Sequence, residues 1–389
     1  MKKIKIVYLS NILNHYQLAL SKGFVKQDNV EYYFISTTTL SEERKKLNIP
    51  EYNHYAEWAV CALDSEEEEK RAYKLFQDAD AAIFGMVPKK YKYFLKDREK
   101  ANKPIFFASE RIYKEKPFFL EMPLRFVLYF FRHTIYRNNY MLCASAFTYP
   151  DYRKTLNYYN KAFRWGYFSE FVEYSIDDLF LKKDSKKTSI VWTGRFLSWK
   201  HPEAMVYLGK YLKEKGYSFD IKMIGVGEEL PKIAEMINQN NLTEEIKLIG
   251  SLSPEKVRNE MDKSNIFVFS SDRGEGWGLV LNEAMNSGCV VVGSNTIGSV
   301  PYLISNGVNG LMFESENWND LCVKVESVIN DFEKQRKLGI NAYLTIKNMW
   351  NPNIAAERFV SLAQNVLMGK GSPFIDDGPC SLAPKKIKF

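Results

Sequence analysis

The sequence is poor in the residues that build disulfide-stapled or metal-centred folds. Its 389 residues include only four histidines and five cysteines. No two cysteines have a Cys-x-x-Cys spacing, and an odd number does not suit a disulfide framework. Their mostly apolar neighbours predict buried, reduced thiols and therefore a reducing compartment. The cysteines are Cys61, Cys143, Cys289, Cys322 and Cys380.

Long hydrophobic runs are also missing. The most aromatic stretch, residues 117–132, is interrupted by Glu121, Pro123 and Arg125, so it does not predict a transmembrane helix. The apolar stretch at the N-terminus is short, and polar residues follow where a signal peptide would stay apolar. We therefore expect a first β-strand there and a cytoplasmic protein.

Positive charge is modest overall but uneven. A net charge of +7 is too small to predict a nucleic-acid partner. Residues 101–170 hold eleven Lys or Arg and five Asp or Glu, together with the aromatic stretch. Such a segment is typical of peripheral binding to an anionic inner membrane surface. A core helix with a charged face is the alternative.

Short β-rich runs alternate with helix-length segments along the whole chain. This spacing is typical of β-α-β units around parallel sheets, and the length favours two domains. The predicted fold class is α/β, with two doubly wound domains. Expected strands are residues 4–9, 32–35, 81–84, 105–108, 140–143 and 163–165 in the first half, and 189–193, 220–224, 246–249, 266–269, 290–293 and 311–313 in the second.

The domain boundaries follow from changes in composition. We predict an N-terminal domain over residues 1–174 and a C-terminal domain over 188–352, joined by a polar, charged linker. A last helix, 353–368, is expected to cross back to the N-terminal domain. Residues 370–389 show no periodicity and are expected to form a flexible tail.

The densest candidate site is residues 270–285, which follow a buried strand and turn into a helix near Leu279. Glycines such as Gly276 and Gly278 let the backbone approach a ligand and expose helix-start amides, which suit a phosphate. Glu275 and Glu283 lie in the loop and in the helix. Carboxylates that only accept hydrogen bonds are good partners for sugar hydroxyls.

Glu275-x7-Glu283, within Glu-Gly-Trp-Gly-Leu-Val-Leu-Asn-Glu-Ala, resembles the E-x7-E signature of retaining GT-B glycosyltransferases (glycosyl transferases group 1, family 4). The resemblance extends upstream to Thr193-Gly194-Arg195 with Lys200, and to residues 224–228, and downstream through residues 290–294 and 306–311. It implies a GT-B fold, in which two Rossmann-like domains face each other across a cleft.

The resemblance also implies roles for individual residues. Glu275 contacts the donor hexose, Glu283 holds the ribose, and Arg195 with Lys200 grips the diphosphate; the main chain at Gly276, Gly278 and Leu279 completes the donor site. Glu275, Arg195 and Lys200 are the expected catalytic residues. Because two cations neutralise the leaving group, no metal or other cofactor is expected. A surface lysine is the alternative for Lys200.

The N-terminal half matches the family less well. The loop after its first strand, residues 10–17, has no glycine, so Asn14 or His15 is expected to act through its side chain. His15 has two interpretations, an acceptor contact and a helix cap. Glu110 also has two, an acceptor or donor contact and a surface ion pair with Arg111. Tyr302 stands where the family often has an acid, and no role transfers to it.

The predicted activity is transfer of a hexose from a nucleoside diphosphate sugar, most commonly UDP, with retention of anomeric configuration. The expected acceptor is a glycan or a lipid-linked glycan, in surface polysaccharide biosynthesis. Two other readings remain: a sugar-nucleotide epimerase of the same fold, and a catalytically silent nucleotide-binding partner of another transferase.

Overall fold

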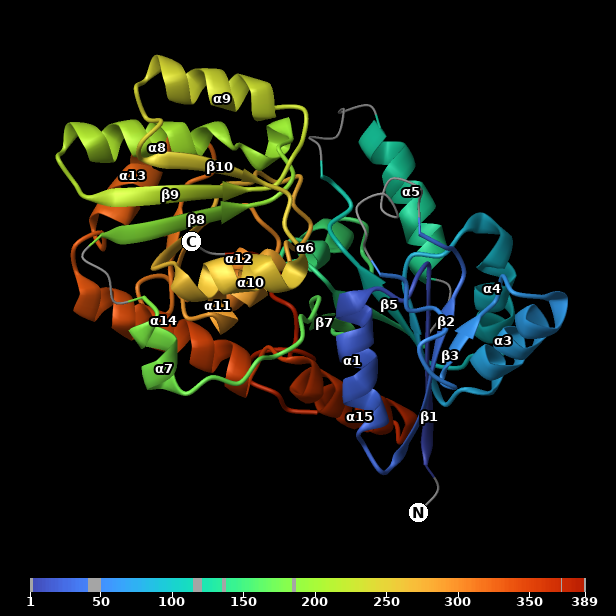
Figure 1. Cartoon of the computed structure of the whole chain (residues 1–389). Helices are drawn as coiled ribbons and strands as arrows, with labels where there is room; N and C mark the ends of the chain where they lie inside the picture. Colours follow the sequence, from blue (N-terminus) through green and yellow to red (C-terminus); the bar gives the residue numbers. More distant parts are fainter. Residues whose placement is uncertain are drawn as a thin grey trace. The chain divides into compact units, whose positions relative to one another are not determined.

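A computed structural model describes residues 3–40, 50–114, 121–134, 138–183, 187–371 and 373–387 (Figure 1). The chain divides into two compact units. The first unit contains the residues up to Glu170 together with the segment that begins at Met349, and the second unit runs from Phe171 to Asn348.

This division lies before the polar segment that the sequence analysis chose as a linker. Part of that segment forms helix α7 (Ile176–Leu181), and its Leu179 is fully buried against Gly288 of the second unit. A single buried leucine on a short helix is hard to recognise among charged neighbours. Residues 184–186 of the expected linker lie outside the described residues.

The first unit is built on a seven-stranded parallel sheet with the strand order β3-β2-β1-β4-β5-β6-β7. Every strand expected in the first half is present, and one short edge strand, β3, was not expected. The strands are β1 (Ile4–Ser10), β2 (Val30–Ser36), β3 (Ala59–Cys61), β4 (Ala81–Phe84), β5 (Ile105–Ser109), β6 (Asn139–Cys143) and β7 (Ala162–Arg164).

Helices cover this sheet. The last helix packs on the first helix of the chain, where Phe24 and Phe359 meet edge to face with ring centroids 5.6 Å apart. The helix that the sequence predicts at 353–368 thus belongs to the first unit. The helices are α1 (His15–Val25), α3 (Glu66–Asp78), η1 (Lys89–Tyr91), α4 (Lys92–Lys100), α5 (Glu121–Thr134), α6 (Thr148–Arg153) and α15 (Pro352–Leu367).

The second unit contains a six-stranded parallel sheet with the order β10-β9-β8-β11-β12-β13. All six strands match expected runs: β8 (Thr188–Thr193), β9 (Phe219–Ile224), β10 (Ile246–Gly250), β11 (Ile266–Phe269), β12 (Val290–Ser294) and β13 (Leu311–Phe313). Both chain halves therefore form the doubly wound α/β domains that the alternating pattern predicts.

Helices lie on both faces of the second sheet (Figure 1). Helices α8, α9 and α13 lie on one face, and α10, α11 and α14 on the other. Their bounds are η2 (Ser198–Lys200), α8 (Glu203–Glu214), α9 (Leu230–Gln239), α10 (Pro254–Lys263), α11 (Val280–Asn286), α12 (Val300–Leu303), α13 (Trp318–Glu326) and α14 (Phe332–Asn348). Ser253 caps α10 by accepting from the Lys256 N–H, as its Ser-Pro-Glu start predicts.

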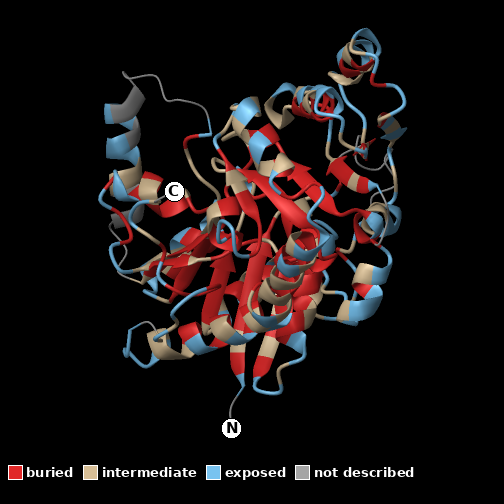
Figure 2. Ribbon diagram, turned by 90° about the vertical axis from the view of Figure 1, so that its left-hand side faces the viewer, coloured by how far each residue is buried: buried red, intermediate tan, exposed pale blue. Residues whose placement is uncertain are grey.

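Buried residues concentrate in the strands of both sheets (Figure 2). Parallel strands covered on both faces are apolar along their whole length, and β4, β11 and β12 are buried at every residue. All five cysteines are free and buried, as their mostly apolar neighbours predict.

Helix α5 does not bury its apolar side chains as a core helix would. Leu124, Val127 and Leu128 are 64%, 48% and 58% exposed, and they share one face of the helix by their spacing. The core-helix alternative is therefore wrong for this face. Residues 117–120 of the basic aromatic segment lie outside the described residues, and within the described chain no helix has the length and apolarity needed to cross a bilayer.

The end of the chain differs from the expected flexible tail. Leu382 forms an antiparallel bridge with Phe163 beside β7, and Cys380 is fully buried. The Arg164 main chain donates to the Ser381 carbonyl and accepts from the Cys380 N–H, at 2.7 and 2.8 Å. Main-chain pairing along an edge strand needs no side-chain periodicity, so the sequence pattern gave no sign of it.

Candidate donor-side and acceptor-side sites

The strand order of the second unit predicts where a ligand would bind. Reading outward from β8, the chain first adds β9 and β10 on one side and then returns to add β11 to β13 on the other. The loops after β8 and β11 therefore diverge at the carboxyl edge of the sheet, where doubly wound folds bind ligands. Arg195 and Lys200 follow β8, and Glu275 follows β11.

Glycines let a third loop pack tightly beside the loop after β8. Gly225 and Gly227 follow β9 with φ values of 137° and 157°. A Cβ atom at Gly225 would lie 1.9 Å from the Gly194 carbonyl oxygen, and one at Gly227 would lie 2.4 Å from that of Phe196. Side chains are thus excluded here, and the Phe196 N–H donates to the Val226 carbonyl at 2.9 Å.

Lys200 and Glu275 form an ion pair and hydrogen bond across the switch point. Their side chains are only 15% and 11% exposed. Ser271 donates a second hydrogen bond to the same carboxylate oxygen, Oε2, at 3.3 Å. The alternative that Lys200 is a surface lysine is therefore wrong: its largely buried ammonium is paired with the acid that the family resemblance assigns to the donor sugar.

Arg195 is placed differently. It directly follows Gly194 after β8, and its side chain is exposed. Among the described residues its guanidinium group forms no ion pair or hydrogen bond. An exposed guanidinium beside the switch point is available to a diphosphate, which it can bind in a bidentate manner.

The loop that carries Glu275 is fixed by its own glycine and tryptophan. Gly278 has φ +77°, and a Cβ atom there would lie 2.2 Å from the Phe269 ring and 3.2 Å from Glu275 Cγ. Trp277 is buried and donates to the Asn282 side chain at 3.0 Å. Gly276 is buried, and Leu279 is the N-cap residue of α11. The motif thus shapes a rigid turn that aims Glu275.

Glu283 lies in the first turn of α11, one helix turn beyond Leu279. Burial raises the pKa of Glu283, and the nearby Arg258 guanidinium partly offsets this. Arg258 also donates to the Glu283 carbonyl at 3.2 Å and to the Asn286 side chain at 2.9 Å. Glu283 is half-buried, and it keeps a cationic neighbour on α10.

A second cross-link between the two loops was not predicted from the sequence. His201 Nδ1 lies 2.8 Å from Glu203 Oε1, and His201 Nε2 lies 3.5 Å from Asp272 Oδ2. Burial lowers the pKa of His201, but the close contact with Asp272, the hydrogen bond with Glu203 and the charges of both acids outweigh it and raise that pKa to about 9. The Asp272 N–H also donates to the Trp199 carbonyl at 3.0 Å. A histidine next to Lys200 was the only sequence signal.

In the first unit, Asn14 is the helix cap that was considered for His15. The Asn14 side chain accepts from the Gln17 N–H at 3.1 Å, and the Gln17 side chain accepts from the Asn14 N–H at 3.5 Å. This capping box holds Asn14 at 7% exposure. His15 is the first residue of α1, and it is exposed.

Two acceptor-side candidates meet through a pair of tyrosines. The His15 ring contacts the Tyr16 ring at 5.3 Å between centroids, and Tyr16 contacts Tyr167 at 4.9 Å. The Tyr167 hydroxyl donates to Glu110 Oε1 at 2.9 Å, and Lys114 Nζ lies 2.6 Å from Glu110 Oε2. Glu110 is thus paired with Lys114. The suggested partner Arg111 instead lies near Asp151, 3.7 Å away.

Comparison with known proteins shows which family part of this chain is similar to. Residues 177–345 match the family described as Glycosyl transferases group 1. The uncharacterized glycosyltransferase MJ1178 of Methanocaldococcus jannaschii is 32% identical over 146 residues, 35% of this chain and 41% of that protein. The capsular polysaccharide biosynthesis glycosyltransferase CapM of Staphylococcus aureus is 28% identical over 182 residues, 46% of each chain. The chain thus spans less than half the length of these relatives.

Among solved structures, Anabaena Alr3699/HepE in complex with UDP has a TM-score of 0.64 at 14% identity, covering 95% of this chain and 100% of that one. At this identity the likeness shows the fold alone. By sequence over residues 177–345 the chain is therefore similar to the glycosyl transferases group 1, and its two Rossmann-like sheets give it the fold of GT-B structures.

Proposed function

We propose that this protein is a retaining glycosyltransferase, which transfers a hexose from a UDP-sugar to a glycan or lipid-linked acceptor in surface polysaccharide biosynthesis. The observation that carries the proposal is the Lys200–Glu275 ion pair. It joins two loops at the topological switch point of the second unit, within the segment that matches the group 1 family. CapM and the UDP complex of HepE support the choice of polysaccharide and UDP.

In this mechanism, Arg195 and Lys200 bind the diphosphate. Lys200 Nζ moves from the Glu275 carboxylate to a phosphate oxygen, where it neutralises the charge that develops on the leaving group. The freed Glu275 accepts hydroxyl groups of the hexose, and the half-buried Glu283 accepts those of the ribose. A lone cation or a lone acid in a 15% exposed site is costly, so the pair preorganises both groups before the donor arrives.

The transfer step breaks the bond between the anomeric carbon and the diphosphate oxygen. The acceptor oxygen bonds to the same face of that carbon, and its proton passes to the departing phosphate, so the configuration is retained. Two protein cations replace a divalent metal here. We expect kcat at saturating donor and acceptor to be unchanged when a chelator is present and magnesium and manganese are withheld.

The acceptor is assigned to the first unit. Aromatic faces and carboxylates are suited to sugar rings and their hydroxyl groups, and His15, Tyr16, Tyr167 and Glu110 combine both in one contact network. His15 is an exposed member of this network and is the residue to which we assign a first contact with the acceptor.

The exposed apolar face of α5 is assigned to the anionic inner surface of the cytoplasmic membrane. Leu124, Val127 and Leu128 lie on this face, within a stretch of the sequence, residues 101–170, that has an excess of Lys and Arg. An amphipathic helix of this kind inserts its apolar face at the headgroup boundary, where lipid-linked acceptors are found.

The decisive experiment is a panel of nucleotide sugars screened by thermal shift, followed by NMR of the product formed with the stabilising donor. The proposal predicts a product of the same anomeric configuration as the donor. An inverted product would refute retention. Isomerised donor without transfer would favour the epimerase, and binding without either reaction would favour a silent partner.

Membrane attachment is tested by sedimentation with vesicles containing anionic lipid. Val127→Glu with Leu128→Glu should abolish binding to these vesicles while leaving transfer to a soluble acceptor intact. Leu181→Glu is the control, because Leu181 is 70% exposed but lies on α7 of the second unit. Equal binding by both variants would remove α5 as the attachment site.

A further inference from the structure

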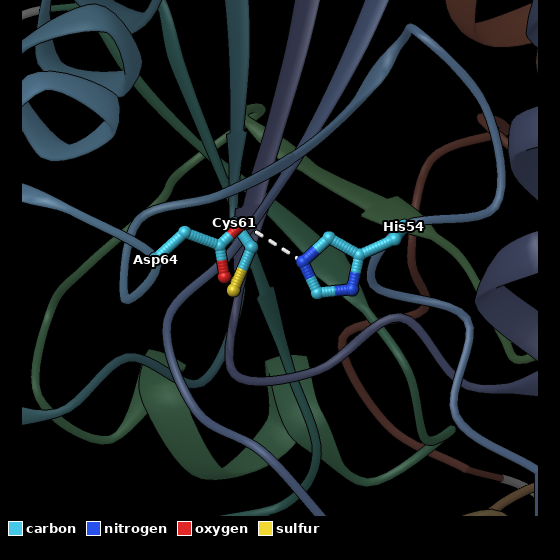
Figure 3. A group of neighbouring side chains, drawn as sticks. All are labelled: His54, Cys61 and Asp64. Atoms are coloured by element: carbon cyan, nitrogen blue, oxygen red, sulfur yellow. Dashed lines mark hydrogen bonds and ion pairs between the residues drawn. The ribbon is translucent and has the colours of Figure 1, made fainter.

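A histidine, a cysteine and an aspartate converge at one edge of the first sheet, on a segment that the proposed function does not use. His54 lies in the turn before β3, Cys61 ends β3, and Asp64 precedes α3 (Figure 3). Their side chains point toward one another in Figure 3, with the Cys61 sulfur beside the Asp64 carboxylate and the His54 ring facing both.

The ligand atoms lie at distances that suit a small cation. One atom from each residue lies within 4.8 Å of the other two, and His54 Nε2 is 2.8 Å from Asp64 Oδ2. Tetrahedral zinc holds nitrogen and oxygen at ~2.0–2.2 Å and sulfur at ~2.3 Å, which separates neighbouring ligands by roughly 3.3–3.8 Å. The side chains of His54 and Asp64 are 67% and 41% exposed, so both have room for the small adjustment required.

Cys61 is the buried member of the group. It is 3% exposed and ends β3, and its sulfur lies beside the Asp64 carboxylate in Figure 3. Four glutamates, Glu66 to Glu69, begin the adjacent helix and add a negative potential.

We propose that His54, Cys61 and Asp64 bind one zinc ion, with water in the fourth position. The ligand set of one nitrogen, one sulfur and one oxygen suits a borderline-soft ion and is a poor match for magnesium or calcium, which prefer oxygen. Binding displaces the thiol proton of Cys61 to solvent and replaces the His54–Asp64 hydrogen bond with two bonds to the metal.

The ion would stabilise an edge strand that has little main-chain pairing of its own. Strand β3 spans three residues and pairs only with β2 among the described strands. The same segment carries Asn53, whose side chain accepts from the Leu13 N–H at 2.9 Å and donates to the Thr38 carbonyl at 3.0 Å. Zinc at Cys61 would therefore also steady the loop that leads into His15, on the acceptor side.

A second group in the second unit makes the test specific. His201, Asp272 and Glu316 also bring three ligand atoms within 4.8 Å, but they contain no sulfur. A thiolate ligand gives bound cobalt a charge-transfer absorption that a nitrogen and oxygen site lacks. Cobalt absorption can therefore tell the two sites apart. Neither this absorption nor a titration with zinc depends on glycosyl transfer.

The experiment measures zinc by titration against a chromophoric chelator and cobalt by absorption, on the full chain. We expect one equivalent of zinc, a rise in melting temperature on its addition, and a cobalt–thiolate band. Cys61→Ser should abolish the band. His54→Gln and Asp64→Asn, which change exposed side chains and so leave the fold intact, should each weaken zinc binding by at least about tenfold. Cys322→Ser, at a buried cysteine of the second unit, should change neither.

Three results would overturn the proposal. The first is the absence of zinc binding to the folded protein. The second is zinc binding that survives His54→Gln and Asp64→Asn but is lost in His201→Asn. The third is bound cobalt without a thiolate band.

Discussion

The two units have the same sheet order around their first strand but differently built loops at the switch point. In both, the first strand of the unit is central and the fourth is added on its other side. In the second unit these loops contain Gly225, Gly227 and Gly278 at positive φ and bury an ion pair. In the first unit the loop after β1 has no glycine, and it is closed by the Asn14 capping box and followed by aromatic rings.

This difference indicates a division of labour. Glycines bring main-chain amides close to a ligand, and a buried cation and acid are suited to a charged diphosphate and a polyhydroxyl group. The capped start of α1 presents the side chains of His15 and Tyr16. The glycine-containing loops of the second unit present main chain instead. The start of α1 suits a larger and less charged molecule, so in the proposed function the second unit binds the donor and the first binds the acceptor.

The strongest test of the difference is to add a side chain where the second unit requires glycine. Gly278→Ala should destabilise the protein by about 2–5 kcal/mol, because it combines a left-handed backbone with a 2.2 Å contact to the Phe269 ring. Gly216→Ala is the matched control, with φ +74° but nothing within 4 Å of its Cβ. Urea unfolding of both variants measures the difference, and equal losses would show that the contact is relieved at little cost.

The next largest effect is expected at the ion pair. Lys200→Ala and Glu275→Ala should each lower kcat by about a hundredfold to a thousandfold, because each removes a charged contact and leaves its largely buried partner unpaired. Lys210→Ala is the control, since Lys210 is 55% exposed on α8. Steady-state kinetics with the stabilising donor is the measurement. Wild-type activity in Lys200→Ala would remove the ion pair from the mechanism.

Glu283 tests binding separately from chemistry. Glu283→Ala should weaken donor affinity by about 1.5–3 kcal/mol through the loss of charged hydrogen bonds. Because burial raises the pKa of Glu283, wild-type donor affinity should also fall as the pH is lowered, starting above the usual range of a glutamate. Calorimetric titration with UDP across pH gives both results. Unchanged affinity in the variant would exclude contact with the ribose.

A change on the acceptor side should affect the KM for acceptor and not the affinity for donor. Tyr167→Phe removes the hydroxyl that donates to Glu110 and should raise the KM for acceptor by roughly threefold to tenfold, an effect of about 1 kcal/mol. Donor affinity should stay as in the wild type. Should donor affinity fall instead, the assignment of the network to the acceptor would be wrong.

The last prediction concerns pH and stability. The folded-state pKa of His201 is about 9 against 6.5 in the unfolded chain, so its contribution is complete below about pH 6.5 and is lost as pH rises through 9. After allowance for solvent, it is on the order of 1–2 kcal/mol. His201→Asn keeps a residue that tolerates the left-handed φ of 50°. Its melting temperature should be lower than wild type at pH 6 and approach it near pH 10; a constant difference would contradict the ion pairs.

The strands and the glycine turn could be predicted from the sequence because the patterns that indicate them are local. Twelve strands were expected from apolar runs, and all twelve are present, since fully covered parallel strands are apolar throughout. The turn around Gly278 and the start of α11 near Leu279 were also expected, because glycine and helix-start patterns act within a few residues.

What the sequence did not predict depends on residues far apart in the chain. Strand β3 is three residues long, Lys200 and Glu275 lie 75 residues apart, and the segment near Cys380 is fixed by pairing with an edge strand. Nothing in a window of neighbours distinguishes a surface lysine from one buried beside an acid. The sequence by itself determined the two α/β sheets and the glycine turn, because periodicity and backbone freedom are local properties. Only the tertiary structure decided which cation meets which acid, because burial and long-range pairing arise when the strands assemble.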